Sequence, residues 1–263
     1  MKTGKKKILV TGSNGQLGKA LRDIADNFSG FEFLFSTSNK LDISNAEQLE
    51  SFFSEYKPDF CINCAGYTNV DLAEKEPEQA FKINAEGVKS LALVCNKYHV
   101  ILVHISTDYV FDGTKRTPYL PEDKTNPINI YGRSKLAGEK YIQECLTHFY
   151  IIRTSWLFHR KHGKNFYKTI LAKSQKGESL SVTGSQTGCP TNAANLARFI
   201  IELIIKGRPY GLLHFCDGKS MTWYEFAKEI LRENNLLEKT SITERDYNTI
   251  APRPVYSVLK SSN

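Results

Sequence analysis

Tyr131 and Lys135 stand four positions apart, and together they have the residue types needed for proton transfer. The segment around them is predicted to be helical, and residues four apart lie on one face of a helix. The hydroxyl and the ammonium can therefore converge on one point. A free tyrosine has a pKa of about 10, and a neighbouring ammonium lowers it toward the range useful at neutral pH. The spacing is common by chance, so other residues must support this interpretation.

A glycine-rich turn directly follows the first predicted strand. Residues 11–18 (TGSNGQLG) place glycines at the spacing G-x-x-G-x-x-G just before a predicted helix. Glycine lets the backbone turn sharply and approach a pyrophosphate, and a helix N-terminus favours the negative charge. The sequence therefore predicts a dinucleotide-binding turn made of Gly12, Asn14, Gly15, Gln16, Leu17 and Gly18.

The end of the second predicted strand bears on the choice of cofactor. An Asp or Glu there would bind the free ribose 2′-hydroxyl of NADH, but residues 36–40 (STSNK) contain no acid. Hydroxyl groups and a nearby cation can accept a 2′-phosphate instead. The sequence thus favours NADPH, with NADH as the alternative, and we expect Asp42 and Ile43 to line the adenine pocket.

The fourth predicted strand ends in Ser106, Thr107, Asp108 and Tyr109. Ligands of open α/β sheets bind beyond the carboxyl ends of the strands. Thr107 would lie there and could donate a hydrogen bond to a substrate carbonyl. A glycine turn, a strand-end threonine and the Tyr131/Lys135 pair, in this order, are typical of a short-chain dehydrogenase or reductase.

Several apolar strands must position these residues. Short apolar runs at 7–11, 31–35, 60–63, 100–106 and 149–153 alternate with predicted helices at 17–27, 46–56, 77–98 and 127–145. Continuous apolar strands separated by helices imply a parallel sheet covered on both faces. We therefore predict an α/β fold with a doubly wound, Rossmann-like parallel sheet and a smaller C-terminal substrate-binding part.

The second half of the chain has a looser pattern. Predicted helices span 165–176, 195–206 and 223–234, a predicted strand spans 211–216, residues 184–192 are expected to form a loop, and 235–263 show weak periodicity. We expect residues 1–156 to form a dinucleotide-binding domain, with 191–216 returning to it. Residues 157–190 and 217–263 would then form the substrate-binding part.

Composition excludes several classes of protein. The chain has 263 residues, 41% of them hydrophobic and 24% charged, and 17 glycines with 9 prolines, which argues against disorder and fibrous folds. Its net charge of +7 fits an anionic small molecule, and we expect no nucleic-acid partner. No membrane span or signal peptide is recognisable, so a cytoplasmic protein with six free cysteines is expected. The single C-x-x-C at 61–64 lacks a second ligand pair, and no metal site is predicted.

Longer motifs extend the pattern over residues 6–259. They are residues 63–71 (NCAGYTNVD), 106–113 (STDYVFDG), 129–139 (NIYGRSKLAGE), 153–156 (RTSW), 186–191 (QTGCPT) and 253–257 (RPVYS). On these motifs the chain resembles the extended short-chain dehydrogenase/reductase family. It departs from the usual pattern at Cys64 and Gly66, where alanines are common.

The resemblance implies a reductase that uses NADPH to convert the 4-keto group of dTDP-4-dehydro-6-deoxy-L-mannose, giving dTDP-L-rhamnose for cell-surface polysaccharide. Tyr131 would donate the proton, Lys135 would hold the cofactor ribose, and Thr107 would orient the carbonyl. The resemblance also implies that Ala65, Gly66 and Tyr67 bind the cofactor, and that Asp108, Tyr109, Trp156 and Arg253 contact the substrate, with Arg253 at the diphosphate. Some members bind Mg²⁺ at a dimer contact, which leaves both Mg²⁺ and a homodimer open here.

Two alternatives stay open. The first is another nucleotide-sugar enzyme, an epimerase or a dehydratase. Related dehydratases carry an Asp-Glu pair directly after the strand-end threonine, whereas this chain has Asp108-Tyr109. The second is a non-catalytic, NADP-binding regulatory subunit, with which an intact Tyr131/Lys135 pair is equally compatible.

Overall fold

A parallel sheet of six strands forms the centre of the computed structural model, which describes residues 4–262. In spatial order its strands are β2 (Phe31–Phe35), β1 (Lys6–Thr11), β3 (Phe60–Asn63), β4 (Ile101–Thr107), β5 (Phe149–Thr154) and β10 (Gly211–His214). The predicted strands are confirmed, although β10 is two residues shorter than expected. Strand order reverses beside β1, so a crevice opens between the carboxyl ends of β1 and β3.

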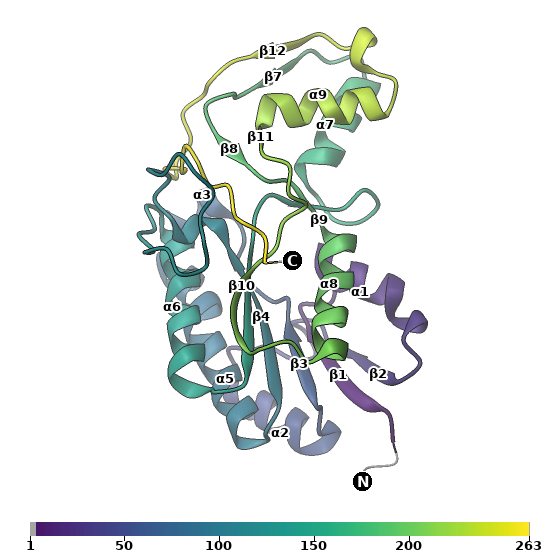
Figure 1. The fold of residues 1–263 in the computed structure, drawn as a ribbon, viewed down its shortest axis with the longest axis vertical. Helices are drawn as coiled ribbons and strands as arrows, with labels where there is room; N and C mark the ends of the chain where they lie inside the picture. The colour runs from purple at the N-terminus through teal and green to yellow at the C-terminus, as the bar shows by residue number, and fades with distance from the viewer. Residues whose placement is uncertain (1–3, 263) are drawn as a thin grey trace.

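Helices cover both faces of this sheet, as Figure 1 shows. Helices α1 (Gln16–Ile24) and α8 (Ala193–Lys206) pack on one face, where apolar residues from both helices meet those of β1, β3 and β5. Helices α2 (Ala46–Tyr56), α5 (Gly87–Lys97) and α6 (Ile130–Cys145) pack on the other. Burial on both faces explains why the strands are apolar throughout, and the predicted doubly wound α/β fold is confirmed.

The predicted helix 77–98 is interrupted. It consists of α4 (Pro77–Phe81), a π-helical turn (η2, Lys82–Glu86) and α5, while the short α3 (Val70–Ala73) precedes it. Periodicity alone does not reveal a π turn, because one extra residue shifts the pattern by less than a third of a turn. The turn contains Asn84, which is fully buried.

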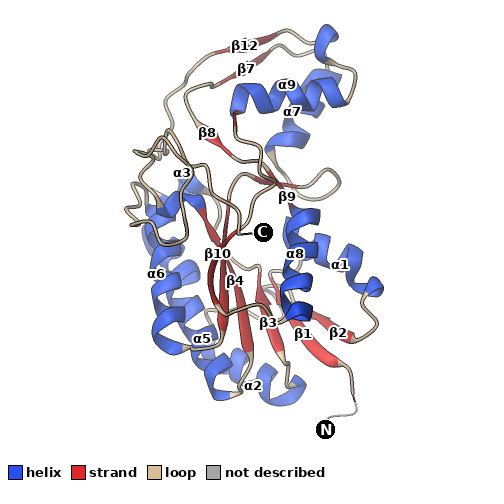
Figure 2. Cartoon of the chain, viewed as in Figure 1, coloured by secondary structure: helices blue, strands red, loops and turns tan. Residues whose placement is uncertain are grey.

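A smaller lobe stands beyond the carboxyl ends of the strands, at the top of Figure 2. It contains α7 (Phe166–Gln175), α9 (Trp223–Glu233) and the parallel pair β7 (Leu180–Val182) and β12 (Ile242–Glu244), which share their own apolar core. Helix α9 begins with a capping box in which Thr222 and Glu225 each accept a hydrogen bond from the other's backbone N–H. Strands β7 and β12 were not predicted, since each has three residues and its partner lies about 60 positions away.

Short pairs connect the lobe to the sheet. Strand β6 (Leu157–Phe158) pairs with β9 (Thr191–Asn192), and β8 (Thr187–Gly188) pairs with β11 (Met221–Thr222). The expected loop at 184–192 therefore includes two very short strands. Three single turns complete the elements: η1 (Ala25–Asn27), η3 (Asp108–Val110) and η4 (Leu237–Lys239).

Two points bear on the expected organisation of the chain. Within residues 4–262, no helix is both long enough and apolar enough to cross a bilayer. The expected boundaries of the two parts include residues 1–3 and residue 263, which lie outside the described residues.

Candidate active site

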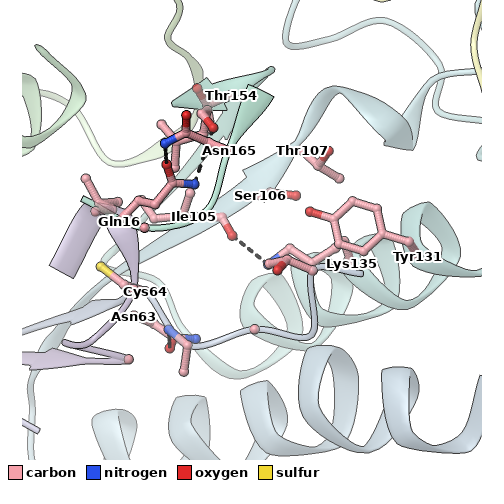
Figure 3. Close-up of a pocket in the computed structure, with 18 of the residues that line it drawn as sticks. Gln16, Asn63, Cys64, Ile105, Ser106, Thr107, Tyr131, Lys135, Thr154 and Asn165 are labelled. Atoms are coloured by element: carbon pink, nitrogen blue, oxygen red, sulfur yellow. Dashed lines mark hydrogen bonds between the residues drawn. The ribbon is translucent and has the colours of Figure 1, made fainter. Parts of the chain in front are cut away.

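A cavity of about 830 Å³ lies where the sheet meets the smaller lobe. It extends over the carboxyl ends of β1, β3, β4 and β5 and under residues 156–166, and Figure 3 shows the side chains at its centre. This is the crevice at which open α/β sheets bind ligands. Most of the residues singled out from the sequence line it: Gly12, Asn14, Gly15, Gln16, Leu17, Asp42, Ile43, Ala65, Gly66, Thr107, Asp108, Tyr109, Tyr131, Lys135 and Trp156.

The glycine turn has the geometry of a phosphate-binding site. Gly12 has a φ of +61°, and a Cβ added there would lie 2.5 Å from the backbone nitrogen of Ala65. Gly18 lies outside the cavity lining, but a Cβ on it would lie 2.5 Å from the Cα of Ser13, so it lets α1 pack against the turn. Gly15 caps α1 without any side-chain hydrogen bond, and the first turn has no acidic residue. The backbone N–H groups of the first turn of α1 therefore stay available to an anion, and the turn fits a dinucleotide pyrophosphate.

The wall beside the turn is held by a residue that the sequence analysis missed. The Asn84 side chain accepts a hydrogen bond from the Tyr67 N–H at 2.8 Å and donates to the Tyr67 carbonyl at 2.9 Å and to Ser134 at 3.0 Å. The π turn thereby fixes the backbone that follows β3. Tyr67 itself turns away from the cavity lining, and its hydroxyl donates to Glu76.

Hydroxyl-bearing residues lie at the end of β2. Thr37 and Ser38 line the cavity there, as expected for a site that takes a phosphate rather than a free hydroxyl. The acidic residue nearest this end in the lining is Asp42, whose carboxylate already accepts hydrogen bonds from the N–H and hydroxyl of Ser44 at 2.9 and 2.8 Å.

Tyr131 is the second residue of α6. Asn129 caps this helix by accepting a hydrogen bond from the Gly132 N–H at 2.7 Å. A Cβ on Gly132 would lie 2.1 Å from the Tyr109 carbonyl oxygen, so only glycine lets α6 approach the end of β4 this closely. The rings of Tyr109 and Tyr131 meet edge to face at 6.0 Å.

Burial raises the pKa of Tyr131 to about 12, and its contact with Thr107 only partly opposes this. Lys135, which was expected to lower this pKa, is not among the groups that do so. The Lys135 Nζ donates instead to the Ile105 carbonyl at 2.6 Å, as Figure 3 shows. Burial lowers the pKa of Lys135 to about 8, while the negative charge of Glu139 acts in the opposite direction.

Asp108 is buried at the base of the site. Its carboxyl group accepts hydrogen bonds from Ser257 at 2.6 Å and from Thr107 at 3.1 Å. Burial nevertheless raises the pKa of Asp108 to about 7. The Ser257 contact ties the C-terminal segment to the end of β4, although these residues are 149 positions apart.

An aromatic pair closes the cavity on the lobe side. Trp156 has a φ of +47°, an uncommon conformation for a residue with a side chain. Its ring stacks on Trp223 with centroids 3.5 Å apart and planes 6° apart, and both rings line the cavity. A Cβ on Gly188 would lie 2.5 Å from the Trp156 indole, so this glycine makes room for the stack.

The cations lie differently from the expectation. Arg253 is absent from the cavity lining, and its guanidinium pairs with Asp71 at 2.8 Å. Within residues 4–262, the cations that line the cavity are Lys135 and Lys164, and Lys164 was not singled out from the sequence. Its two neighbours both touch Gln16: a Cβ on Gly163 would lie 2.4 Å from Gln16 Cγ, and Asn165 donates to Gln16 Oε1 at 2.7 Å. Lys164 therefore lies close to the N-terminus of α1.

One cluster of metal-ligating residues occurs in the described part of the chain, at Asp23, His159 and His162. The ring nitrogen Nδ1 of His159 already accepts the N–H groups of Lys161 and His162, both at 3.0 Å. His162 Nε2 contacts the Asp23 carboxylate at 2.7 Å. These contacts connect the loop after β6 to α1.

Comparisons with known proteins agree with this geometry. A family model described as "RmlD substrate binding domain" matches residues 6–263. A dTDP-4-dehydrorhamnose reductase of Aggregatibacter actinomycetemcomitans is 37% identical, over 96% of this chain and 90% of the relative. The spore coat polysaccharide biosynthesis protein SpsK of Bacillus subtilis is 38% identical, over 96% and 88%. A crystal structure of dTDP-4-dehydrorhamnose reductase from Bacillus anthracis, in complex with NADP, superposes with a TM-score of 0.94 at 38% identity and covers 98% of this chain and 91% of that one.

Proposed function

The chain belongs to the dTDP-4-dehydrorhamnose reductase family, and on this premise we propose how its own residues carry out the reaction. The substrate is a dTDP-4-dehydro-6-deoxy-L-hexose, the reductant is NADPH, and the product is dTDP-L-rhamnose. The observation that carries the proposal is that one cavity brings four groups together. They are the N-terminus of α1, which has no side-chain cap, the buried phenol of Tyr131, the buried amine of Lys135 and the strand-end Thr107.

We assign the cofactor to the sheet domain and the sugar nucleotide to the side of the smaller lobe. The open N–H groups at the start of α1 receive the pyrophosphate, and Lys164 adds a positive charge beside them. Thr37 and Ser38 receive the 2′-phosphate. Trp156 offers its ring to the substrate from the lobe side.

NADPH, when bound, would supply the hydride that reduces C4 of the sugar. Tyr131 then donates its phenolic proton to the oxygen that gains charge, so that the ketone becomes an alcohol. A phenol whose pKa is about 12 is fully protonated at neutral pH, which suits a proton donor in the reducing direction. Thr107 orients the carbonyl, and Lys135 holds the ribose hydroxyls that lie next to Tyr131.

The dehydratase alternative has less support. Such a reaction requires a base to remove the C5 proton, and the position after Asp108 holds Tyr109. Burial and the neighbouring Asp108 raise the pKa of Tyr109 above its ordinary value, so its phenol keeps its proton and is not available as that base.

One assay tests the proposal against all alternatives. The purified protein is mixed with NADPH and the dTDP-linked 4-keto-6-deoxy-L-sugar, NADPH consumption is followed, and the product is identified. Stoichiometric consumption with formation of dTDP-L-rhamnose is expected. An epimerase would give a product without net consumption, a dehydratase would release water without consumption, and a regulatory subunit would bind NADPH without turnover.

Tyr131→Phe should lower kcat by about 100-fold or more, the usual scale for a lost general acid. The affinity for NADPH, measured by calorimetry, should stay within about twofold. Tyr141→Phe is the matched control, because Tyr141 lies on the same helix with its hydroxyl at the surface, donating to Glu86. Full turnover in Tyr131→Phe would contradict the assigned role.

A further inference from the structure

A buried hydrogen-bond chain lies behind Lys135 and reaches the glycine turn. Lys135 Nζ is 3.2 Å from His104 Nε2, and His104 Nδ1 is 3.0 Å from Asn63 Nδ2. Asn63 Oδ1 accepts the Thr11 hydroxyl at 2.6 Å and the Ala65 N–H at 3.2 Å. Thr11, Asn63 and His104 are fully buried, and Lys135 is 5% exposed.

The direction of each hydrogen bond in this chain follows from one backbone group. The Ala65 N–H can only donate, so the Asn63 atom that faces it must be the oxygen. The Asn63 amide nitrogen then faces His104, and because it can only donate, His104 Nδ1 must be the acceptor. A neutral imidazole that accepts at Nδ1 carries its proton on Nε2. In His104 this N–H points at the Lys135 nitrogen.

We propose that His104 is a positioning residue for Lys135, and that its Nε2–H group donates to Lys135 Nζ and favours the neutral amine. A neutral amine can accept this hydrogen bond and still donate to the Ile105 carbonyl. An ammonium has no lone pair, so its protons would face the Nε2–H group directly. Protonation of His104 would only add to the repulsion, and burial together with Lys135 lowers the pKa of His104 well below its ordinary value.

The other groups around Lys135 act in both directions. Glu139 on α6 and Cys64 after β3 favour the ammonium when charged, and burial favours the amine. Burial raises the pKa of the Cys64 thiol far above its ordinary value, so this group is neutral. Tyr131, on the same face of α6, is protonated and uncharged. Burial and the His104 N–H group therefore both favour the amine, and Glu139 opposes them.

This inference rests on the proposed function for its consequence. A smaller proportion of ammonium at Lys135 leaves less positive charge facing the phenol, which favours the protonated Tyr131 that the reaction requires. His104 itself does not pass protons onward, because the group behind its Nδ1 is the Asn63 amide, which cannot exchange one.

Three variants test the proposal. His104→Phe keeps a ring but has no N–H, His104→Gln keeps an amide N–H near the position of Nε2, and Asn63→Asp offers His104 Nδ1 an acceptor in place of a donor. Nitrogen-15 NMR of labelled histidine reports which ring nitrogen is protonated. Carbon-13 NMR of labelled lysine follows the titration of Lys135, which Lys135→Met assigns.

Nδ1 should be unprotonated in the parent protein and protonated in Asn63→Asp. In His104→Phe the titration midpoint of Lys135 should rise by about 1, a tenfold increase in the ratio of ammonium to amine. His104→Gln should stay near the parent value. The pH profile of kcat/KM should shift in the same direction as the lysine titration.

A protonated Nδ1 in the parent protein overturns the proposal, and so does an unchanged Lys135 midpoint in a folded His104→Phe variant. Should His104→Phe fail to fold, the ring-nitrogen signals of the parent and of Asn63→Asp still decide the question. These NMR readouts need no turnover, so they stand even if the protein proves to be inactive on the keto sugar.

Discussion

At the Tyr131 hydroxyl, burial is the main influence on the pKa. The sequence analysis expected an ammonium to pull this pKa down, but the phenol is enclosed and Lys135 is engaged with the Ile105 carbonyl. The spacing of Tyr131 and Lys135 predicts that they share one face of a helix. It does not predict how deeply that face is buried. For a proton donor this outcome is chemically suitable, since the phenol must keep its proton until C4 is attacked.

Lys164 provides a prediction at the same scale. Lys164→Met should weaken NADPH binding by about fivefold, the effect of an exposed ion pair, and the loss should shrink as salt rises. Calorimetry at low and high salt measures both effects. Lys161→Met, which removes an exposed cation of the same loop that does not line the cavity, should change little. If NADPH affinity stays constant and KM for the keto sugar rises, Lys164 serves the substrate diphosphate instead.

At the scale of elements, the π turn and helix α6 depend on each other. Gly138 on α6 leaves room for the π turn, since a Cβ there would lie 2.2 Å from the Asn84 carbonyl oxygen. Asn84 in turn bonds Ser134 on the same helix and the backbone of Tyr67. The contact between the π turn and α6 therefore fixes the position of the backbone that follows β3 in the cavity wall.

Helix α6 is also joined to the sheet by a buried ion pair. The Glu139 carboxylate accepts two hydrogen bonds from Arg153 on β5, at 2.7 and 3.0 Å, and one from the Ser106 hydroxyl on β4. Glu139→Gln should lower the free energy of unfolding by about 3 kcal/mol, because it leaves the Arg153 charge buried without a counterion. Urea denaturation measures this loss.

Glu202→Gln is the control for this prediction. It breaks an exposed pair with Lys206 on α8, one helical turn away. Such pairs contribute about 0.5 kcal/mol or less. Equal losses of unfolding free energy in Glu139→Gln and Glu202→Gln would mean that the buried ion pair stabilises the protein no more than the exposed one.

For the whole molecule, Asp108 makes stability depend on pH. Its pKa is near 7 in the folded protein and near 3.8 when exposed, so the folded state binds more protons between about pH 4 and 7. The contribution of Asp108 to the free energy of unfolding is therefore fully present below this window and is lost as pH rises through it.

Asp108→Asn should flatten the fall in unfolding free energy between pH 4 and 7, as measured by urea denaturation at several pH values. Asp112→Asn is the control, because hydrogen bonds from Thr114 lower the pKa of Asp112 to about 2. Its contribution is present above about pH 4 and is lost only as pH falls toward 2. An unchanged slope in Asp108→Asn would show that Asp108 does not titrate in this window.

The sequence predicts what local patterns encode. The strands, the glycine turn and the convergence of Thr107, Tyr131 and Lys135 on one edge of the sheet follow from period, spacing and the direction of parallel strands. Contacts between distant segments do not follow. The pairing of Arg253 with Asp71, 182 positions away, is one such contact. His104, Asn84 and Lys164 were missed because their roles depend on which segments fold against them.

The stacked indoles of Trp156 and Trp223 have a practical consequence. The chain contains two tryptophans, and both lie in the wall of the same cavity. The intrinsic fluorescence that long-wavelength excitation produces thus originates at this single place. Any molecule that enters beside Trp156 perturbs the whole signal, so the unlabelled protein is its own optical probe of occupancy.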